Sequence, residues 1–199
     1  MTSPDPIRTL RQFLPGRRVE RCDLCGAELP KRHGHLLDAR THRLTCACEP
    51  CGVLFEHRGA GGYLRVPRAV RRLADFAITD AEWDSLRIPI GLAFFVNTAQ
   101  GRVVAMYPGP AGPTESLLTF DAWADLAARS LTLAAMEPEV EALLVNRIGA
   151  ERDSYLAPID RCYELCGVLR THWRGFSGGE DVWREIREYF ARLREVADA

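Results

Sequence analysis

Five of the seven cysteines lie within residues 22–51, and four of these form two C-x2-C-G units. A C-x2-C turn directs two thiolates to one point, and a glycine directly after it permits a tight backbone whose amides face the sulfurs. Two such units can complete a tetrahedral site of four sulfurs. The spacing therefore predicts one metal ion bound by Cys22, Cys25, Cys48 and Cys51.

Zn²⁺ is the metal expected of four thiolates in a reducing compartment. A single iron ion in a rubredoxin-like centre uses the same ligands and is the alternative. Rubredoxin-type centres usually have a dense aromatic core, whereas residues 22–51 contain no Phe, Tyr or Trp, so the sequence favours zinc. Four thiolates close a structural site, and no hydrolytic motif such as H-E-x-x-H occurs in the chain. An enzyme is therefore the less favoured reading.

The fifth cysteine of this segment, Cys46, leaves several ligand sets open. It precedes Cys48 by two residues, so on a strand it would face the same side as Cys48. It could replace Cys48, supplement it, or lie beside the site without binding metal, and the last is the preferred interpretation. Nearby histidines leave open a second metal site or a mixed set of cysteine and histidine ligands: His33, His35, His42 and His57.

The composition is that of a globular protein. The chain has 199 residues, of which 47% are hydrophobic and 27% charged, enough for one domain or one domain with a small satellite. The longest apolar run, residues 88–96, is too short to cross a membrane and contains Pro89. No apolar segment of a secretory signal follows the first fifteen residues. We therefore expect no membrane insertion and a cytoplasmic location, where thiols stay reduced.

Charge is distributed unevenly along the chain. Residues 1–72 carry 14 Lys and Arg against 7 Asp and Glu, whereas residues 73–199 carry 12 against 20. The two parts could dock on each other, or the basic part could steer an acidic protein partner. Nucleic-acid binding is a further alternative but an unfavoured one, because the net charge is −1 and the chain has one lysine. The arginines available for it are Arg17, Arg18, Arg21, Arg65, Arg68, Arg71 and Arg72.

The pattern of elements predicts an α+β fold with three parts. Residues 1–19 form a flexible basic arm, residues 20–62 a zinc-ribbon-like metal module, and residues 63–199 an α+β domain with antiparallel strands and C-terminal helices. Within the module, residues 35–38 and 42–47 should form a hairpin between the two cysteine units.

In the larger part, two strand pairs and several helices are expected. The strand pairs are 92–96 with 103–107 and 140–148 with 155–159. Capping boxes place helix starts after Thr79 and Ser177, Thr119 caps another helix, and a helix covers about 159–173 with Cys162 and Cys166 buried on its apolar stripe. Residues 65–72 should form a turn and a short helix, and residues 108–113 a proline-rich loop.

Several segments together resemble an uncharacterised protein family, chiefly from high-GC actinobacteria. They are the double cysteine unit with His33-Gly-His35 and Cys46-Ala-Cys48, then residues 88–95, 107–116, 157–164 and 172–176. The resemblance covers nearly the whole chain. Genes of that family often lie beside nickel–iron hydrogenase structural and maturation genes. The resemblance implies an accessory protein whose partner is a hydrogenase subunit or maturation factor, and it carries over only the four cysteines of the two units, as metal ligands.

Overall fold

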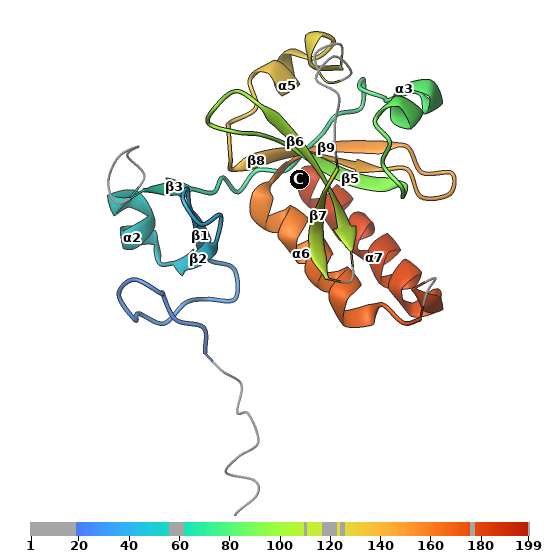
Figure 1. The fold of residues 1–199 in the computed structure, drawn as a ribbon. Helices are drawn as coiled ribbons and strands as arrows, with labels where there is room; N and C mark the ends of the chain where they lie inside the picture. Colours follow the sequence, from blue (N-terminus) through green and yellow to red (C-terminus); the bar gives the residue numbers. More distant parts are fainter. Residues whose placement is uncertain are drawn as a thin grey trace, which may run out of the picture.

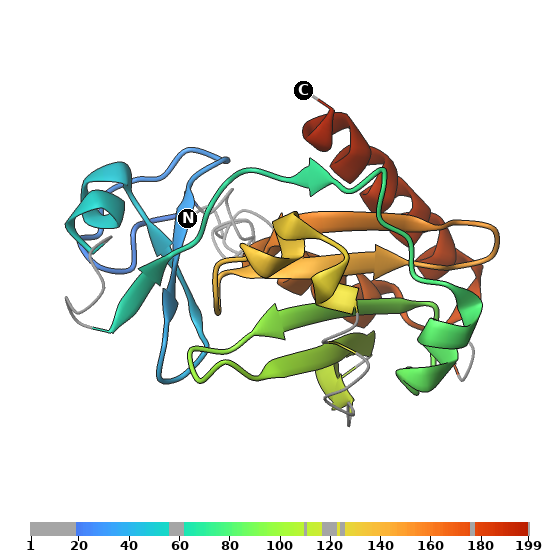
Figure 2. The same ribbon diagram turned by 90° about the horizontal axis from the view of Figure 1, so that it is seen from above.

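The computed structural model describes residues 19–55, 62–109, 111–116, 123, 126–175 and 178–198. These residues form two antiparallel sheets and several helices, which confirms the α+β class. The small sheet lies beside the cysteine units at one end of the molecule, and the large sheet carries the remaining helices (Figures 1 and 2). The predicted arm over residues 1–19 lies outside the described residues except for Val19.

The small sheet has the strand order β2-β1-β3. Strands β1 (Gly34–Asp38) and β2 (Leu44–Ala47) form the predicted hairpin, and the short helix α2 (Glu49–Leu54) follows. β3 (Tyr63–Arg65) pairs with the other edge of β1. The small sheet therefore uses residues on both sides of position 62, and the division of the chain at that position stays a prediction.

The large sheet has the strand order β4-β9-β8-β5-β6-β7, with every neighbouring pair antiparallel. Both predicted strand pairs are present in it. Its strands are β4 (Arg71–Arg72), β5 (Leu92–Asn97), β6 (Val103–Gly109), β7 (Gly112–Ser116), β8 (Glu141–Asn146) and β9 (Asp153–Pro158).

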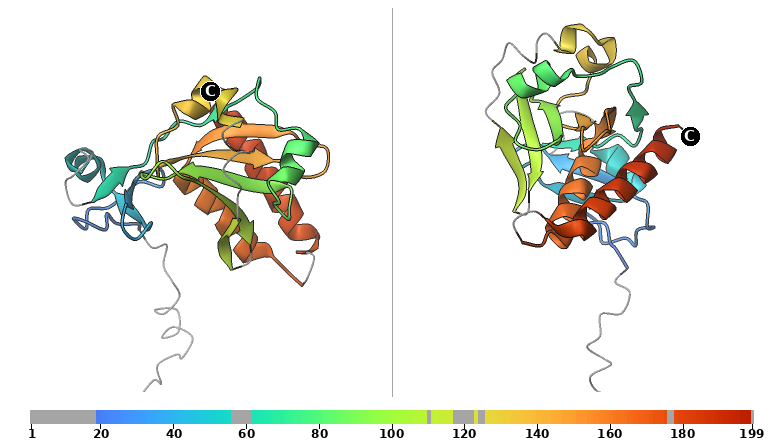
Figure 3. Two further views of the ribbon diagram at one scale, coloured as in Figure 1. Left: turned by 45° about the horizontal axis from the view of Figure 1, so that its top comes forward. Right: turned by 90° about the vertical axis from the view of Figure 1, so that its right-hand side faces the viewer.

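Both faces of the large sheet are covered, which explains why its central strands are apolar throughout. On one face, Phe94 packs with the helices α6 (Ile159–His172) and α7 (Gly179–Ala197). On the other, Phe95 packs near α3 (Asp80–Ser85) and α5 (Leu131–Ala134). Successive side chains of a strand point to opposite faces, so neighbouring residues of β5 enter two separate cores. The two layers of helices are visible in Figure 3.

Two predictions about irregular segments are wrong. Residues 65–72 form no helix, and Arg71 and Arg72 instead pair with β9 at the edge of the large sheet. The described residues at both ends of the predicted loop 108–113 are strand instead, because β6 continues to Gly109 and Pro108 lies opposite Pro113 in β7. Proline has no backbone N–H to donate to a neighbouring strand. Here β7 is an edge strand, so one side of it has no neighbour, and two residues that face each other as a non-hydrogen-bonded pair need no donor.

The helix starts were predicted with mixed success. Thr79 and Glu82 form the expected capping box of α3, in which each residue binds the backbone N–H of the other. α7 begins at Gly179 with Gly178 as its N-cap, so the box predicted one residue earlier is wrong; Ser177 itself lies outside the described residues. The helix predicted after Thr119 also lies outside them, apart from Trp123 and residues 126–128. No helix in the described ranges is long and apolar enough to span a bilayer.

The small sheet and the large sheet share one apolar core. Leu37 of β1 and Val66 after β3 are 1% and 3% exposed and belong to the cluster around Phe94 and α6. Polar contacts join residues 1–72 to residues 73–199 as well: Arg72 lies 2.9 Å from the buried Asp153, and His42 Nδ1 lies 3.4 Å from a carboxylate oxygen of the buried Glu139. The N-terminal part therefore docks on the C-terminal part, largely through apolar packing.

Candidate metal centre

The first cysteine unit is a tight turn closed by its own backbone. The N–H of Gly26 donates to Cys22 O at 2.8 Å, and the N–H of Cys22 donates to Ala27 O at 2.8 Å. Gly26 has φ +76°, a conformation that side chains other than glycine rarely adopt. The glycine of the motif is thus required by the turn. The resulting loop presents Cys22 buried and Cys25 exposed.

The second cysteine unit is built differently, because it opens a helix. Cys48 is the N-cap of α2, Pro50 lies in the first turn, and Cys51 follows within the helix. Gly52 is helical and buried, so it does not supply the positive φ that Gly26 supplies. The N–H of Gly52 donates to Cys48 O at 2.8 Å and holds the first turn together.

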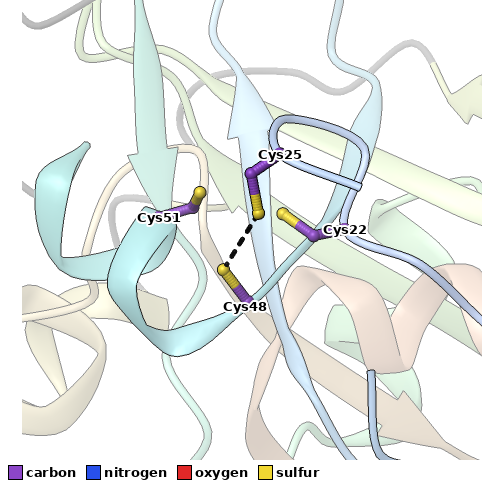
Figure 4. A group of neighbouring side chains, drawn as sticks. All are labelled: Cys22, Cys25, Cys48 and Cys51. Carbon is purple, nitrogen blue, oxygen red and sulfur yellow. Dashed lines mark hydrogen bonds between the residues drawn. The ribbon is translucent and has the colours of Figure 1, made fainter. Parts of the chain in front are cut away.

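The structure brings the four predicted ligands together. All four Sγ atoms lie within 4.8 Å of one another. Cys25 Sγ and Cys48 Sγ, from different units, are 3.5 Å apart (Figure 4). A tetrahedral zinc site with Zn–S distances of about 2.3 Å separates its sulfurs by about 3.8 Å. The four thiols therefore fit a single four-coordinate metal ion, and both zinc and iron suit this ligand set.

The electrostatics of the cluster also suit a cation. Burial alone would raise the pKa of Cys22, but backbone hydrogen bonds from Cys48, Cys25 and Leu24 outweigh it and lower that pKa to about 6. The neighbouring sulfur of Cys48 is the main cause that raises the pKa of Cys51 to about 12. The Cys22 thiolate therefore forms readily, whereas neighbouring sulfurs raise the pKa of Cys51 and oppose ionisation of Cys25. A bound divalent cation removes that opposition, because it favours the thiolate form of every ligand.

A second group of metal-ligating side chains lies on the same hairpin. Ligand atoms of His33, His35 and Cys46 lie within 4.8 Å of one another, and Cys46 groups with these histidines rather than with the four cysteines. The backbone of Cys46 also supports the first unit, since its N–H donates to Asp23 Oδ2 at 2.7 Å and its carbonyl accepts from Asp23 N at 2.9 Å. His42 lies elsewhere, beside Glu139, and His57 is outside the described residues.

The two remaining cysteines are core residues, as predicted. Cys162 and Cys166 of α6 are 0% and 5% exposed and pack in the cluster around Phe94. Burial raises the pKa of Cys166 to about 12 and that of Cys162 well above its ordinary value. Neither thiol is reactive in this environment.

The arginines considered for nucleic-acid binding are largely engaged by carboxylates. Arg65 and Arg68 both bind Glu49 of α2, and Arg72 binds the buried Asp153. Arg21 pairs with Glu28 and Arg71 lies 3.9 Å from Glu141. Arg17 and Arg18 lie outside the described residues. Where the side chains are described, these arginines therefore offer little uncompensated positive charge.

Comparison with known proteins assigns the family. No curated protein and no solved structure matches the chain. DUF5947, a family of unknown function, matches residues 21–197, a range that includes both cysteine units, both sheets and both C-terminal helices. The chain therefore belongs to the DUF5947 family.

Proposed function

We propose that the protein is a cytoplasmic, zinc-binding accessory protein that supports the assembly or maturation of a nickel–iron hydrogenase through protein–protein contacts. The observation that carries the zinc assignment is the convergence of Cys22, Cys25, Cys48 and Cys51, with all four sulfurs within 4.8 Å. Four thiolates leave no open coordination position, so the ion has a structural role. The choice of partner rests on the resemblance to a family whose genes lie beside hydrogenase genes.

The helix that carries the last ligand offers a surface for such a partner. Val53 and Leu54 of α2 are 52% and 66% exposed, and they follow directly after Cys51 and Gly52. Because α2 has only six residues, its position depends on the ligands at its start. Zinc binding would thus hold two exposed apolar side chains in place for a protein contact.

Metal content and colour test the zinc assignment. The protein is purified without a metal-binding tag, and its metals are measured by elemental analysis together with a visible spectrum. We expect zinc in stoichiometric amount, no visible absorption, and loss of the ion bound by the four cysteines in Cys25→Ser. Stoichiometric iron with thiolate charge-transfer bands would instead support the rubredoxin-like electron carrier, since zinc is colourless in this ligand set.

Co-purification with hydrogenase subunits and maturation factors tests the partner. We expect Leu54→Asp to keep its zinc and to lose the complex. Leu131→Asp is the matched control, because Leu131 is 90% exposed on α5 of the larger part, and it should bind normally. A Cys25→Ser protein that had lost the ion of the four-cysteine site and still formed the complex would contradict the role given to that ion.

Nucleic-acid binding is tested by a salt titration. Phosphate contacts weaken steeply with salt because binding releases counterions. The carboxylates beside Arg65, Arg68 and Arg72 lead us to expect no binding at physiological salt. Binding of nucleic acid at physiological salt that weakens as salt is added, and that Leu54→Asp retains, would overturn this expectation.

A further inference from the structure

We propose that His33, His35 and Cys46 bind a second transition-metal ion of the Zn²⁺ class, with one coordination position left for water or a small anion. This site is distinct from the four-cysteine site and does not depend on the hydrogenase assignment. Its three ligand atoms lie within 4.8 Å of one another. Two imidazoles and one thiolate form a ligand set that suits zinc and its neighbours in the first transition row.

The hairpin places these side chains on one face. His35 of β1 lies directly opposite Cys46 of β2 in the antiparallel register. His33 precedes His35 by two residues, which in extended chain returns it to the same face, and the two imidazole rings are 4.9 Å apart. The register of β1 and β2 therefore brings His35 and Cys46 together, and the only contacts described from the cysteine turns are the two hydrogen bonds between Asp23 and the backbone of Cys46.

The hydrogen bonds of both histidines leave the same nitrogen available for a metal. His33 Nδ1 lies 3.0 Å from Pro30 O, and His35 Nδ1 lies 2.8 Å from Asp160 Oδ2. A carbonyl or carboxylate oxygen can only accept, so each Nδ1 donates a proton, and the nitrogen that can give a lone pair to a metal is Nε2. Histidines that bind metals are commonly oriented in this way, with the second nitrogen donating to a carbonyl or carboxylate.

An unpartnered buried nitrogen points independently to a ligand. The His33 side chain is 7% exposed, and its Nε2 is buried with no hydrogen-bond partner among the described residues. Asp160 Oδ1, beside His35, is likewise buried without a donor. Buried polar atoms without partners are costly, and such atoms in a folded protein call for a water or an ion. A metal ion on Nε2 satisfies the buried nitrogen of His33.

The surroundings leave space at the metal. His33 and His35 line a pocket with a volume of about 490 Å³ between the small sheet and the ends of α6 and α7. Lys31 and Arg32 also line this pocket. Zinc sites with three protein ligands keep a fourth position for water or substrate, whereas four-thiolate sites are closed. Cationic side chains around that position favour an anion as the fourth ligand.

The number of metal ions per chain tests the proposal. We expect two zinc ions in the full-length protein and one in His35→Asn. The asparagine amide can keep the hydrogen bond to Asp160, but it has no counterpart of the imidazole Nε2. This variant therefore removes the metal ligand and preserves the contact between β1 and α6. Cys46→Ala should also hold one ion. The matched control is His42→Asn, since asparagine tolerates the positive φ of +52° at that position, and it should keep two.

The result that overturns the second site is one zinc per chain in the wild-type protein with the same content in His35→Asn. The four-cysteine site would then still stand, because its ion is lost in Cys25→Ser. If circular dichroism shows that Cys46→Ala is poorly folded, the zinc content of His35→Asn alone decides whether the second site exists. Asp160 acts as a positioning residue in this proposal, and Asp160→Asn should weaken the second ion about 10–100-fold in chelator competition. Unchanged affinity in Asp160→Asn would remove Asp160 from the site.

The open position is tested with cobalt and azide. In protein loaded with two Co²⁺ ions, azide should shift the visible absorption, because it can bind only where a coordination position is free. His35→Asn, which retains the closed four-thiolate site, should show no shift. A wild-type spectrum that azide leaves unchanged would overturn the open position.

Discussion

The small sheet with its cysteine units and the large sheet with its helices are stabilised by different means. In residues 19–55 the buried apolar side chains are few: Cys22, Leu29, Leu36, Leu37 and Ala47. The large sheet buries apolar residues on both faces, in two separate cores. The first region therefore needs metal ligation to hold its turns, whereas the second is stabilised mainly by apolar burial. The metal ligands are thus concentrated in the region that has few buried apolar side chains.

Removal of one cysteine ligand should show most clearly that the two regions are stabilised independently. We expect Cys25→Ser to lose the four-cysteine metal ion completely and to unfold the segment around the cysteine turns, since ligation there supplies folding free energy. The amide NMR signals of residues 20–29 and 48–54, around the two cysteine units, should collapse to unfolded positions, while those of β1, β5, β8 and β9 stay dispersed. Cys166→Ala is the matched control and should keep its metal, because Cys166 is a core residue of α6. Global unfolding of Cys25→Ser would contradict the claim that the large sheet is stable without the four-cysteine metal ion.

The next largest effect is expected in the large sheet, at a buried carboxylate. The Asp153 side chain is 5% exposed and binds Arg72 of β4 at 2.9 Å and Arg194 of α7 at 2.6 Å. Asp153→Asn removes the buried anion from both guanidinium groups and leaves Arg194 with Glu151 at 3.5 Å, which should lower the free energy of unfolding by about 1–3 kcal/mol. Asp181→Asn, at an exposed pair with Arg184, should change it by less than about 0.5 kcal/mol. Chemical denaturation measures both, and metal content should be unchanged.

The same carboxylate predicts a pH dependence. Burial opposes ionisation of Asp153, but the hydrogen bonds from Arg194 and Arg72 outweigh burial and lower its pKa. A lowered pKa in the folded state stabilises the fold above the unfolded pKa of about 4, and this contribution is lost as the pH falls through the lower, folded value. The difference in unfolding free energy between wild type and Asp153→Asn should therefore shrink below about pH 4. A difference that grows on acidification would contradict the assignment.

The smallest expected effect is at the start of α3. Thr79 Oγ1 accepts from Glu82 N at 3.3 Å, and Glu82 Oε2 accepts from Thr79 N at 2.7 Å. Thr79→Ala should lower the unfolding free energy by about 1 kcal/mol and leave the metals bound. Thr171→Ala removes a hydroxyl that donates to Gly167 O within α6, and its effect should stay below about 0.5 kcal/mol. Equal losses in the two variants would show that Thr79 does not act as a cap.

Local patterns predicted the elements that depend on neighbouring residues. The two cysteine units, the hairpin of β1 and β2, and the capping box at Thr79 all need contacts within a short stretch of chain, so their spacing sufficed. The strands around Arg71 and Pro113 were missed for other reasons. Arg71 pairs with Leu156 of β9, a strand far away in the chain. Pro113 pairs with Pro108 of the preceding strand, and it was missed because proline argues against a strand ladder.

The second ligand group was predictable in part. The two-residue spacing of His33 and His35 is a strand signal that places both on one face. The pairing of His35 with Cys46 depends on the register of the turn between β1 and β2, which composition does not fix. The hydrogen bond from His35 to Asp160 spans 125 residues, and no local pattern could have predicted it.

The strand order of the large sheet has a consequence for synthesis on the ribosome. Arg71 of β4 pairs with Leu156 of β9, 85 residues later, whereas the four-cysteine site is complete once Cys51 has emerged. Chains emerge N-terminus first, so the nascent protein can take up its metal long before the sheet can close. Ribosome-bound chains that end near residue 120 should show cysteines protected from alkylation only when zinc is present; equal reactivity with and without zinc would contradict this order. Metal supply would then act on this protein during translation, before the rest of the molecule exists to be folded.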